Sequence, residues 1–293
     1  MDRKHFLKIL SLLPLSNYAN NINTISKLTD ALPGTDKMPV LFLGHGSPMN
    51  AIQENEFVTG FRDLAKTLPR PQAIICVSAH YYTNGTFITA MEKPKTIHDF
   101  GGFPQALFDV QYPAPGKPEL AKETKSLIKK ASVGLDEKDW GLDHGAWSVI
   151  KHLYPKADVP VLELSIDYTK PASWHYELAK ELATLRNKGV LIVGSGNIVH
   201  NLYEAQFNKP GFKYDWAIEA REKINKLITD GDHRSLCNYN ILGTAIKKAV
   251  PTPDHFLPLL YTLALKEEKD LLSLFNDKIV SGSLSMTSVV INK

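Results

Sequence analysis

The stretch MPVLFLGHGSP, residues 38–48, decides the fold class of this chain. Its apolar run stops at Gly44, and the two glycines that flank His45 let the backbone turn tightly. A short apolar run bounded by Gly and Pro is typical of a strand that is buried on both faces of a sheet. Further short runs, mostly β-branched and bounded by Gly, Pro or Ser, lie at residues 72–78, 159–166 and 190–193.

Segments with helical spacing of apolar residues separate these runs. They lie at residues 57–68, 118–130, 146–154, 171–186 and 215–229. The alternation of strand and helix predicts an α/β fold with an open, mainly parallel central sheet and helices on both faces. Residues 283–291 alternate in polarity, which indicates an antiparallel strand at an edge. Because no repeat or linker interrupts residues 38–293, we expect one domain there.

The composition excludes several classes of protein. Hydrophobic residues make up 43% of the 293 residues and charged ones 22%, as in ordinary globular proteins. The net charge of +3 is too small to indicate a nucleic-acid partner. The only cysteines, Cys76 and Cys237, provide neither a disulfide framework nor a zinc-finger spacing. No apolar run reaches the roughly 18 residues that a membrane span needs.

Residues 1–37 form a polar leader that ends in a turn cluster. Its first residues, MDRKHFLK, precede a short apolar run and resemble a weak twin-arginine export signal. Pro14 interrupts that run, and no A-x-A cleavage site follows it. We therefore expect a cytoplasmic protein, with export as the alternative.

Three predicted strands each deliver a histidine near the carboxyl end, where parallel α/β sheets bind their ligands. His45 and His80 follow the first two runs, and His200 follows the run at 190–193 through a Gly-rich turn. A single loop histidine is usually a hydrogen-bonded structural residue. Three of them on adjacent strand ends, about 5–10 Å apart, are within reach of a shared metal ion.

Two further histidines stand at predicted helix starts. Asp143 is a natural N-cap beside His144, and Thr252 or Asp254 could cap the helix that follows His255 at residues 257–265. Capping explains the acidic residues but leaves the two histidines unexplained. The other histidines considered lie in helical or polar surface segments. We expect solvated side chains for them, namely for His5, His152, His175 and His233.

Residues 96–104 form a Gly-rich aromatic loop of the kind that covers a pocket. His98 and Phe103 in this loop are candidate substrate-binding residues, because such rings can stack on a flat substrate. The alternative is that the loop simply packs onto the domain.

Together these motifs resemble the bacterial and plant 4,5-DOPA dioxygenase extradiol family, within the class III extradiol ring-cleavage dioxygenases. That class includes the catalytic subunit of protocatechuate 4,5-dioxygenase. The resemblance covers residues 38–291 and lies in LGHGSPM (43–49), SAH (78–80), HDFGGFP (98–104), DHG (143–145), SGNIVHN (195–201) and PTPDH (251–255). It implies an open α/β catalytic domain at residues 38–293 that opens a catechol ring with O2 and one non-haem divalent metal ion.

By motif position, the resemblance implies a set of site residues. The metal ligands would be His45, His80 and His255. His200 would be the acid/base residue or a fourth group on the metal, and His144 would lie near the catechol hydroxyls. An imidazole near neutral pKa can take a proton from the substrate and return it, which suits His200.

Two features of this ligand set stay open in the sequence. The wider superfamily uses two histidines and a carboxylate, so Asp254 competes with the adjacent His255 for the third position; the motif favours His255. Fe2+ suits the reaction, but a site of three imidazoles also suits Zn2+.

The leading hypothesis is an extradiol dioxygenase acting on a DOPA-like catechol. A zinc hydrolase on the same fold is the first alternative, distinguished by activity with zinc and without O2. A binding module that has lost catalysis is the second, and the joint presence of His45, His80, His200 and His255 argues against it. The ring substituents, the cleaved bond and the oligomeric state are not readable from the sequence.

Overall fold

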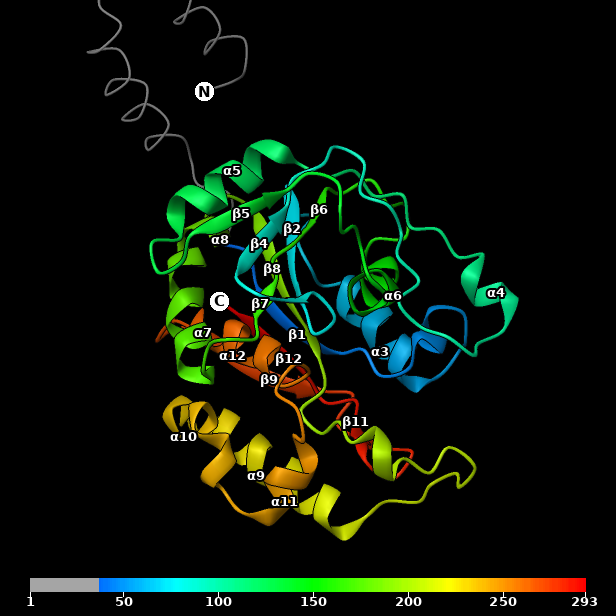
Figure 1. The fold of residues 1–293 in the computed structure, drawn as a ribbon. Coiled ribbons are helices and arrows are strands. Elements are labelled where there is room, and N and C mark those ends of the chain that lie inside the picture. The colour runs from blue at the N-terminus through cyan, green and yellow to red at the C-terminus, as the bar shows by residue number, and fades with distance from the viewer. Residues whose placement is uncertain (1–36) are drawn as a thin grey trace, which may run out of the picture. The chain divides into compact units, whose positions relative to one another are not determined.

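A six-stranded sheet forms the centre of residues 37–293, the part of the chain that the computed structural model describes (Figure 1). Across the sheet, the strands are β6 (Val161–Glu163), β2 (Ala73–Ser78), β8 (Val190–Gly196), β1 (Val40–Gly44), β12 (Ser288–Asn292) and β9 (Leu271–Phe275). The first four are parallel to one another, and β12 pairs antiparallel with both β1 and β9. The predicted mainly parallel sheet is confirmed.

Helices and short strand pairs surround this sheet. The helices are α3 (Glu56–Ala65), α4 (Gln105–Phe108), α5 (Pro118–Leu127), α6 (His144–Leu153), α7 (Ala172–Ala179), α8 (Ala183–Arg186), α9 (Asp215–Asp230), α10 (His233–Cys237), α11 (Thr244–Ala249) and α12 (Leu257–Ala264). The 3-10 turns are η1 (Pro48–Ala51), η2 (Lys180–Leu182), η3 (Leu202–Glu204) and η4 (Tyr239–Ile241). Outside the central sheet, β3 (Tyr82–Thr83) pairs with β7 (Ile166–Asp167), β4 (Thr86–Thr89) with β5 (Val133–Asp136), and β10 (Ile279–Val280) with β11 (Leu284–Ser285).

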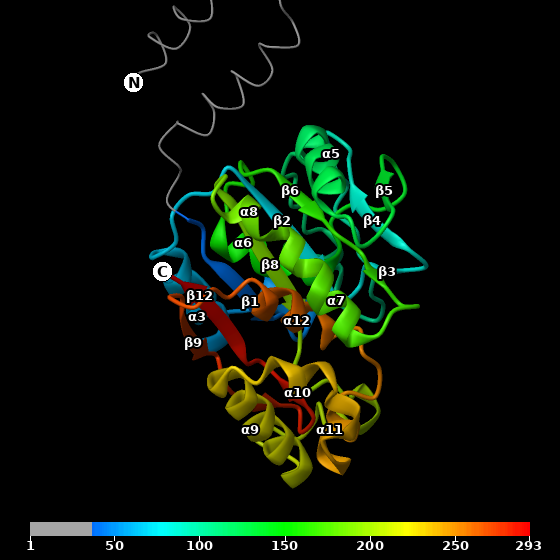
Figure 2. The ribbon, with the colours of Figure 1, turned by 90° about the vertical axis from the view of Figure 1, so that its left-hand side faces the viewer.

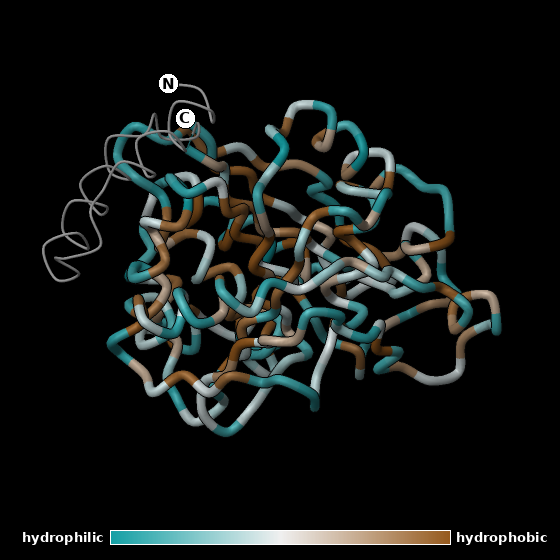
Figure 3. Tube along the Cα trace, turned by 90° about the horizontal axis from the view of Figure 1, so that it is seen from above, coloured by the Kyte–Doolittle hydropathy of each residue, from teal (hydrophilic) through white to brown (hydrophobic). Residues whose placement is uncertain are grey.

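Both faces of the sheet are covered by helices, as predicted (Figure 2). Val40 and Phe42 of β1 belong to the apolar cluster that includes α7 and α12. Leu41 and Leu43, which alternate with them, belong to the cluster on the other face with α3 and α6. All of β1 is therefore buried, which explains its unbroken apolar sequence. Figure 3 shows the same arrangement, with apolar residues along the central strands and polar ones around them.

The C-terminal segment differs in its position from the prediction. The antiparallel direction expected for residues 283–291 is confirmed, but β12 lies inside the sheet. The edge belongs to β9, a strand that the sequence analysis did not predict. The outward side of β9 is open to solvent, and Leu271 is 68% exposed.

Three predicted elements are divided in the structure, and the strand expected at 283–291 is one of them, since it forms β11 and β12. The strand expected at 159–166 ends at Glu163: the Leu164 amide still donates to the Cys76 carbonyl of β2, but the Ser165 amide donates to the Phe87 carbonyl of β4, and Ile166 begins β7. The helix expected at 171–186 contains the 3-10 turn η2, which separates α7 from α8.

One predicted helix cap is confirmed and one is wrong. The Asp143 carboxylate accepts a hydrogen bond from the Ala146 amide and caps α6. The helix α12 starts after Phe256 without a side-chain cap, so neither Thr252 nor Asp254 has the predicted role. The reason is that the Asp254 carboxylate bonds to the ring of His255 instead.

The prediction of solvated histidines is wrong for His152 and His175, which are buried on the inner sides of α6 and α7. Each ring has polar partners: His152 bonds to the Asn50 carbonyl, and His175 to Tyr261 and the Asp167 carbonyl. A buried imidazole is tolerated when its nitrogens are satisfied in this way. His5 and the rest of the predicted leader lie outside the described residues. Within residues 37–293, no helix is long and apolar enough to cross a membrane.

Candidate metal centre

Three imidazole rings meet beyond the carboxyl ends of β1 and β2. They belong to His45 directly after β1, to His80 shortly after β2, and to His255 just before α12. Their ring centroids are 5.2, 5.2 and 5.1 Å apart, which makes a nearly equilateral triangle. One ring nitrogen of each lies within 4.8 Å of the others, and the Nε2 atoms of His45 and His80 are 3.3 Å apart. One cation can therefore reach all three rings.

A hydrogen bond behind the triangle fixes the ring of His45. Its Nδ1 lies 3.0 Å from Ser195 Oγ in β8. That hydroxyl donates its own hydrogen to the Gly145 carbonyl at 2.5 Å, so it accepts the Nδ1 hydrogen of His45. The lone pair on Nε2 is then left for a metal ion. Burial and the neighbouring His80 hold the His45 pKa well below its ordinary value, which keeps the ring neutral.

Carboxylates support the other two rings. His80 Nδ1 lies 3.1 Å from Asp99 Oδ2, and His255 Nδ1 hydrogen-bonds to Asp254 Oδ2. A carboxylate behind a ligating histidine fixes its tautomer and makes Nε2 a better donor. Burial lowers the pKa of His255 to about 4, against the opposing effect of Asp254. The imidazole of His255 thus completes the triangle, while Asp254 contacts its far side.

Two glycines allow the strands to approach His45 and His255 closely. A Cβ atom on Gly196 would lie 2.1 Å from the His255 carbonyl oxygen, and one on Gly44 would lie 2.6 Å from the Met286 carbonyl oxygen. The Asn197 amide also donates to the His255 carbonyl at 2.9 Å. The Gly-rich turn after β8 therefore sets the position of His255 through direct backbone contact.

His200 lies against the triangle on one side. Its ring stacks on that of His255, with 3.5 Å between centroids and an interplanar angle of 6°. No side chain or backbone group of residues 37–293 hydrogen-bonds to its ring nitrogens. Burial, with a further contribution from His255, lowers the pKa of His200 to about 2. The ring is thus neutral, and its nitrogens are open to a hydrogen bond from a ligand.

His144 lies on another side of the triangle, at the start of α6. Its ring centroid is 4.0 Å from that of His80, and its Nδ1 is 3.0 Å from Asp99 Oδ1. Asp99 therefore connects His80 and His144, and it also accepts the His144 amide at 2.9 Å. Burial raises the pKa of Asp99, but hydrogen bonds from both histidines outweigh burial and hold that pKa well below its usual range. Asp99 is an anion that orients two rings at once.

These five histidines line one cavity of about 320 Å³. Its size fits a single substituted benzene ring with a few neighbouring atoms. The remaining walls are Gly46, Ser47, Pro48, Asp99, Phe100, Phe103, Leu202, Phe207 and Leu284. A polar floor of imidazoles thus faces walls that are largely apolar and aromatic.

A comparison with known families identifies the protein family to which this chain belongs. The family described as the catalytic LigB subunit of aromatic ring-opening dioxygenase matches residues 39–289. The chain belongs to the LigB family. It is accordingly an extradiol aromatic ring-opening dioxygenase, and the resemblance found in the sequence is confirmed.

Individual LigB-family relatives cover most of the chain. The 4,5-DOPA dioxygenase extradiol of Escherichia coli K12 is 46% identical over 266 residues, which cover 89% of this chain and 97% of the relative. The Beta vulgaris protein of the same name is 34% identical over 254 residues, 84% of this chain and 94% of the relative. A crystal structure of an uncharacterized Escherichia coli K12 protein has a TM-score of 0.77 and 42% identity, and covers 87% of this chain and 100% of that one.

The two predicted substrate-binding residues of this LigB-family enzyme have different positions. Phe103 lines the cavity, whereas His98 is not among its lining residues. The Nε2 of His98 bonds to the Val110 carbonyl at 2.9 Å, and its ring packs edge-on against Phe100. The loop at 96–104 therefore both covers the pocket and packs onto the domain. Phe100 and Phe103 face the cavity, and His98 anchors the loop.

The sequence analysis missed several residues of the LigB-family site. Asp99 was quoted in a motif without a role, although a carboxylate beside loop histidines is a signal for an orienting group. Ser195 was treated only as part of a Gly-rich turn. Leu202 and Phe207 lie in an irregular segment after His200, where no periodicity marks the buried side.

Proposed function

We propose that this dioxygenase opens a DOPA-like catechol with O2 at a single non-haem divalent metal ion. One carbon–carbon bond next to the two ring hydroxyls breaks, and both oxygen atoms of O2 enter the ring-opened product. The observation that carries the proposal is the triangle of His45, His80 and His255, with the Nδ1 atom of each ring held from behind.

The residues present fit a divalent metal ion. Three imidazoles would hold it, leaving positions open for other ligands, as Fe2+ oxygenase sites require. When bound, the metal would accept both catechol oxygens and lower the pKa of the hydroxyls. Fe2+ and Zn2+ both suit imidazole donors, and Fe2+ is the ion that we propose for ring cleavage.

His200 is the proposed acid/base residue. Its ring lines the cavity without a hydrogen-bond partner in residues 37–293, so a ring nitrogen is available to the hydroxyl of an incoming catechol, whose acidity a bound metal would raise. The stacking on His255 keeps this ring beside the triangle. The same nitrogen can return the proton to the product as the ring opens.

His144 is the proposed second group near the hydroxyls. The carboxylate of Asp99 accepts the Nδ1 hydrogen of His144, which leaves its Nε2 as an acceptor that can orient a hydroxyl. Phe100 and Phe103 form an aromatic wall at 5.4 Å between centroids, against which a flat ring can pack. These contacts would place the ring and exclude water.

The test is to remove metal from the purified protein, reload it anaerobically with Fe2+, add L-DOPA and admit air. We expect O2 uptake and a yellow ring-opened product. His45→Ala should abolish product and His200→Ala should strongly slow its formation. His233→Ala should do neither, because His233 bonds to Tyr176 outside the cavity. A wild-type protein that consumes no O2 with any catechol would contradict the proposal.

A zinc hydrolase is the second candidate function, favoured by one observation. A set of three imidazoles without a carboxylate ligand also suits Zn2+ with an activated water. Hydrolysis of a test ester by the zinc form, together with an inactive iron form, would support this alternative. For cellular location, the cytoplasm remains our proposal; residues 1–36, which would carry any export signal, lie outside the described part.

A further inference from the structure

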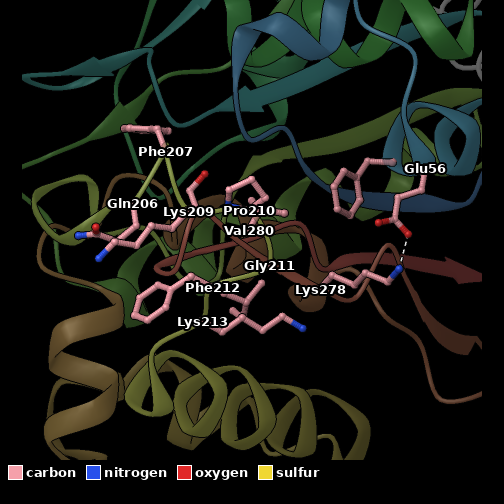
Figure 4. A pocket seen from close by; sticks show the side chains of 13 residues that line it. Glu56, Gln206, Phe207, Lys209, Pro210, Gly211, Phe212, Lys213, Lys278 and Val280 are labelled. Carbon is pink, nitrogen blue, oxygen red and sulfur yellow. Dashed lines mark hydrogen bonds and ion pairs between the residues drawn. The ribbon is translucent and has the colours of Figure 1, made fainter.

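Glu163 is a buried acidic residue without a cationic partner. It stands at the carboxyl end of β6, opposite Cys76 of β2, and none of its surface is exposed. By contrast, Glu56 lines a cavity of about 380 Å³ that shares Phe207 with the histidine cavity, and it pairs with Lys278 (Figure 4). No lysine, arginine or histidine of residues 37–293 forms an ion pair with Glu163. A carboxyl group in such a place is stable only when it is neutral or held by strong hydrogen bonds.

The partner of Glu163 is a second buried carboxyl group, that of Asp143. Glu163 Oε1 accepts the Asp143 backbone amide at 2.8 Å, and the two side chains also share a hydrogen bond. The indole Nε1 of Trp140 lies 3.2 Å from Glu163 Oε2 and 3.4 Å from Asp143 Oδ2, so one indole hydrogen faces both carboxyl groups. Two carboxylates that share one buried site cannot both keep a negative charge. Burial, and then the charge of Asp143, raise the pKa of Glu163 well above its usual range, so Glu163 is the neutral member of the pair.

Asp143 connects this pair to two loops of the metal centre. Its Oδ1 accepts the Ser78 hydroxyl at 2.7 Å and the Ala146 amide at 3.1 Å, and the second of these bonds caps α6. Ser78 Oγ in turn accepts the His80 amide at 3.3 Å. His144 follows Asp143 directly in the chain, and its ring centroid is 4.0 Å from that of His80. The position of one carboxylate therefore fixes the backbone that carries both rings.

The two loops are packed too closely to move independently. A Cβ atom on Gly145 would lie 2.5 Å from Ser78 Oγ and 2.9 Å from His80 Cδ2. A shift of Asp143 away from Glu163 would therefore move the start of α6 against the ring of His80. A negative charge on Glu163 would cause such a shift, because it would repel the Asp143 carboxylate in surroundings of low dielectric constant.

We propose that Glu163 is a positioning residue whose hydrogen bonds to Asp143 set the spacing between the two histidine rings. It acts as a neutral carboxylic acid. Because it does not line the histidine cavity, it touches neither the metal ion nor the substrate. The inference rests on the proposed function, in which His80 is a metal ligand and His144 orients a catechol hydroxyl.

The first experiment compares two substitutions of similar size. Glu163→Gln keeps a neutral group that accepts the Asp143 amide and donates to its carboxylate, so kcat with L-DOPA should stay within about threefold of wild type. Glu163→Met keeps the volume but has no strong hydrogen-bonding group, so kcat should fall about tenfold or more, as expected when reacting groups are displaced. Zn2+ affinity, measured by competition with a chelator, should fall about tenfold in Glu163→Met and be retained in Glu163→Gln.

Glu181→Met is the matched control. The Glu181 carboxylate also accepts backbone amides, those of Lys129 and Lys130, but it does not line the histidine cavity. Glu181→Met should leave kcat and Zn2+ affinity unchanged, which separates positioning from a general loss of packing. If Glu163→Met does not fold, Glu163→Asp replaces it: the shorter acid withdraws from the Asp143 amide and should lower kcat about fivefold.

The infrared spectrum tests the neutral state of Glu163 without turnover. At about pH 8, where exposed carboxyl groups are ionised, wild type should show the C=O band of a protonated carboxyl group, and Glu163→Gln should lack it. Absence of this band from wild type would overturn the inference, as would equal losses of kcat in Glu163→Gln and Glu163→Met. Wild-type kcat and Zn2+ affinity in Glu163→Met would overturn it too. If wild type opens no catechol ring but Zn2+ affinity follows the expected order, the proposed function fails and this inference stands.

Discussion

The rings of His200 and His255 stack within 6° of parallel, with 3.5 Å between their centroids, yet their hydrogen bonds differ. His255 Nδ1 bonds to Asp254, whereas the His200 nitrogens have no partner in residues 37–293. One ring is thus oriented as a metal ligand, and the other is available to a proton.

This difference predicts distinct effects of removing each ring. His255→Ala should lose bound metal, because one corner of the triangle is gone. His200→Ala should retain metal but lower kcat with L-DOPA by about 10²–10⁴-fold, the usual loss of a general acid/base. Metal content by mass spectrometry and kcat on the same samples would check both. Loss of metal from His200→Ala would instead make His200 a ligand.

Asp99 connects His80 and His144, so its loss should disturb two rings at once. We expect Asp99→Asn to weaken metal affinity by about 10–100-fold, as is usual when the carboxylate behind a ligand is removed. Competition with a chelator would measure the change. Asp109→Asn is the control, because Asp109 is exposed and bonds only to Gln105. Equal metal affinity in wild type and Asp99→Asn would contradict the orienting role.

Gly196 should tolerate no side chain, because a Cβ atom there would lie 2.1 Å from the His255 carbonyl oxygen. We expect Gly196→Ala to destabilise the protein by about 1–3 kcal/mol and to weaken metal binding, since His255 must shift. Urea unfolding and metal content would show both effects. Gly101→Ala serves as the control, because a Cβ atom at Gly101 meets nothing within 4 Å. A Gly196→Ala protein with wild-type metal affinity would contradict this prediction.

Burial lowers the pKa of His175 to about 4, from an ordinary value of 6.5. Above pH 6.5 the ring is neutral in both folded and unfolded states. As the pH falls from 6.5 to 4, the unfolded chain binds a proton that the folded one does not, so stability falls. The loss attributable to His175 is about 3 kcal/mol.

His175→Gln removes this titration and should flatten the pH dependence of the free energy of unfolding between pH 6.5 and 4. The comparison with wild type isolates His175, because the other histidines are common to both proteins. Parallel curves for the two proteins would show that His175 is protonated in the folded state as well.

Much of the fold could be predicted because its signals are local. A strand buried on both faces has an unbroken apolar sequence, and β1 and β2 are of this kind. Since parallel strands end at the same edge, the meeting of His45 and His80 followed from sheet topology. The edge strand β9 escaped prediction because its exposed side resembles a loop.

The rest of the site depends on contacts between distant segments, which no local pattern records. Asp254 looked like a helix cap because capping needs only neighbouring residues, yet its carboxylate is used by the ring of His255. His175 looked solvated because the burial of one helical residue depends on what packs against it, here Tyr261 from α12. Phe207 lines two cavities, but it lies in an irregular segment without hydrophobic periodicity, so the sequence does not show which way its side chain points.

The late segments of the chain support its earliest histidine, with a consequence for the order of events in the cell. The Gly44 amide donates to the Ser288 hydroxyl at 3.0 Å, and Met286 packs against the turn around His45. A nascent chain on the ribosome that has exposed only β1 and β2 presents His45 and His80 without His255 and without the late segments that contact the turn around His45. The triangle of imidazoles therefore forms only after the segment that contains His255 and the last strands have been synthesised.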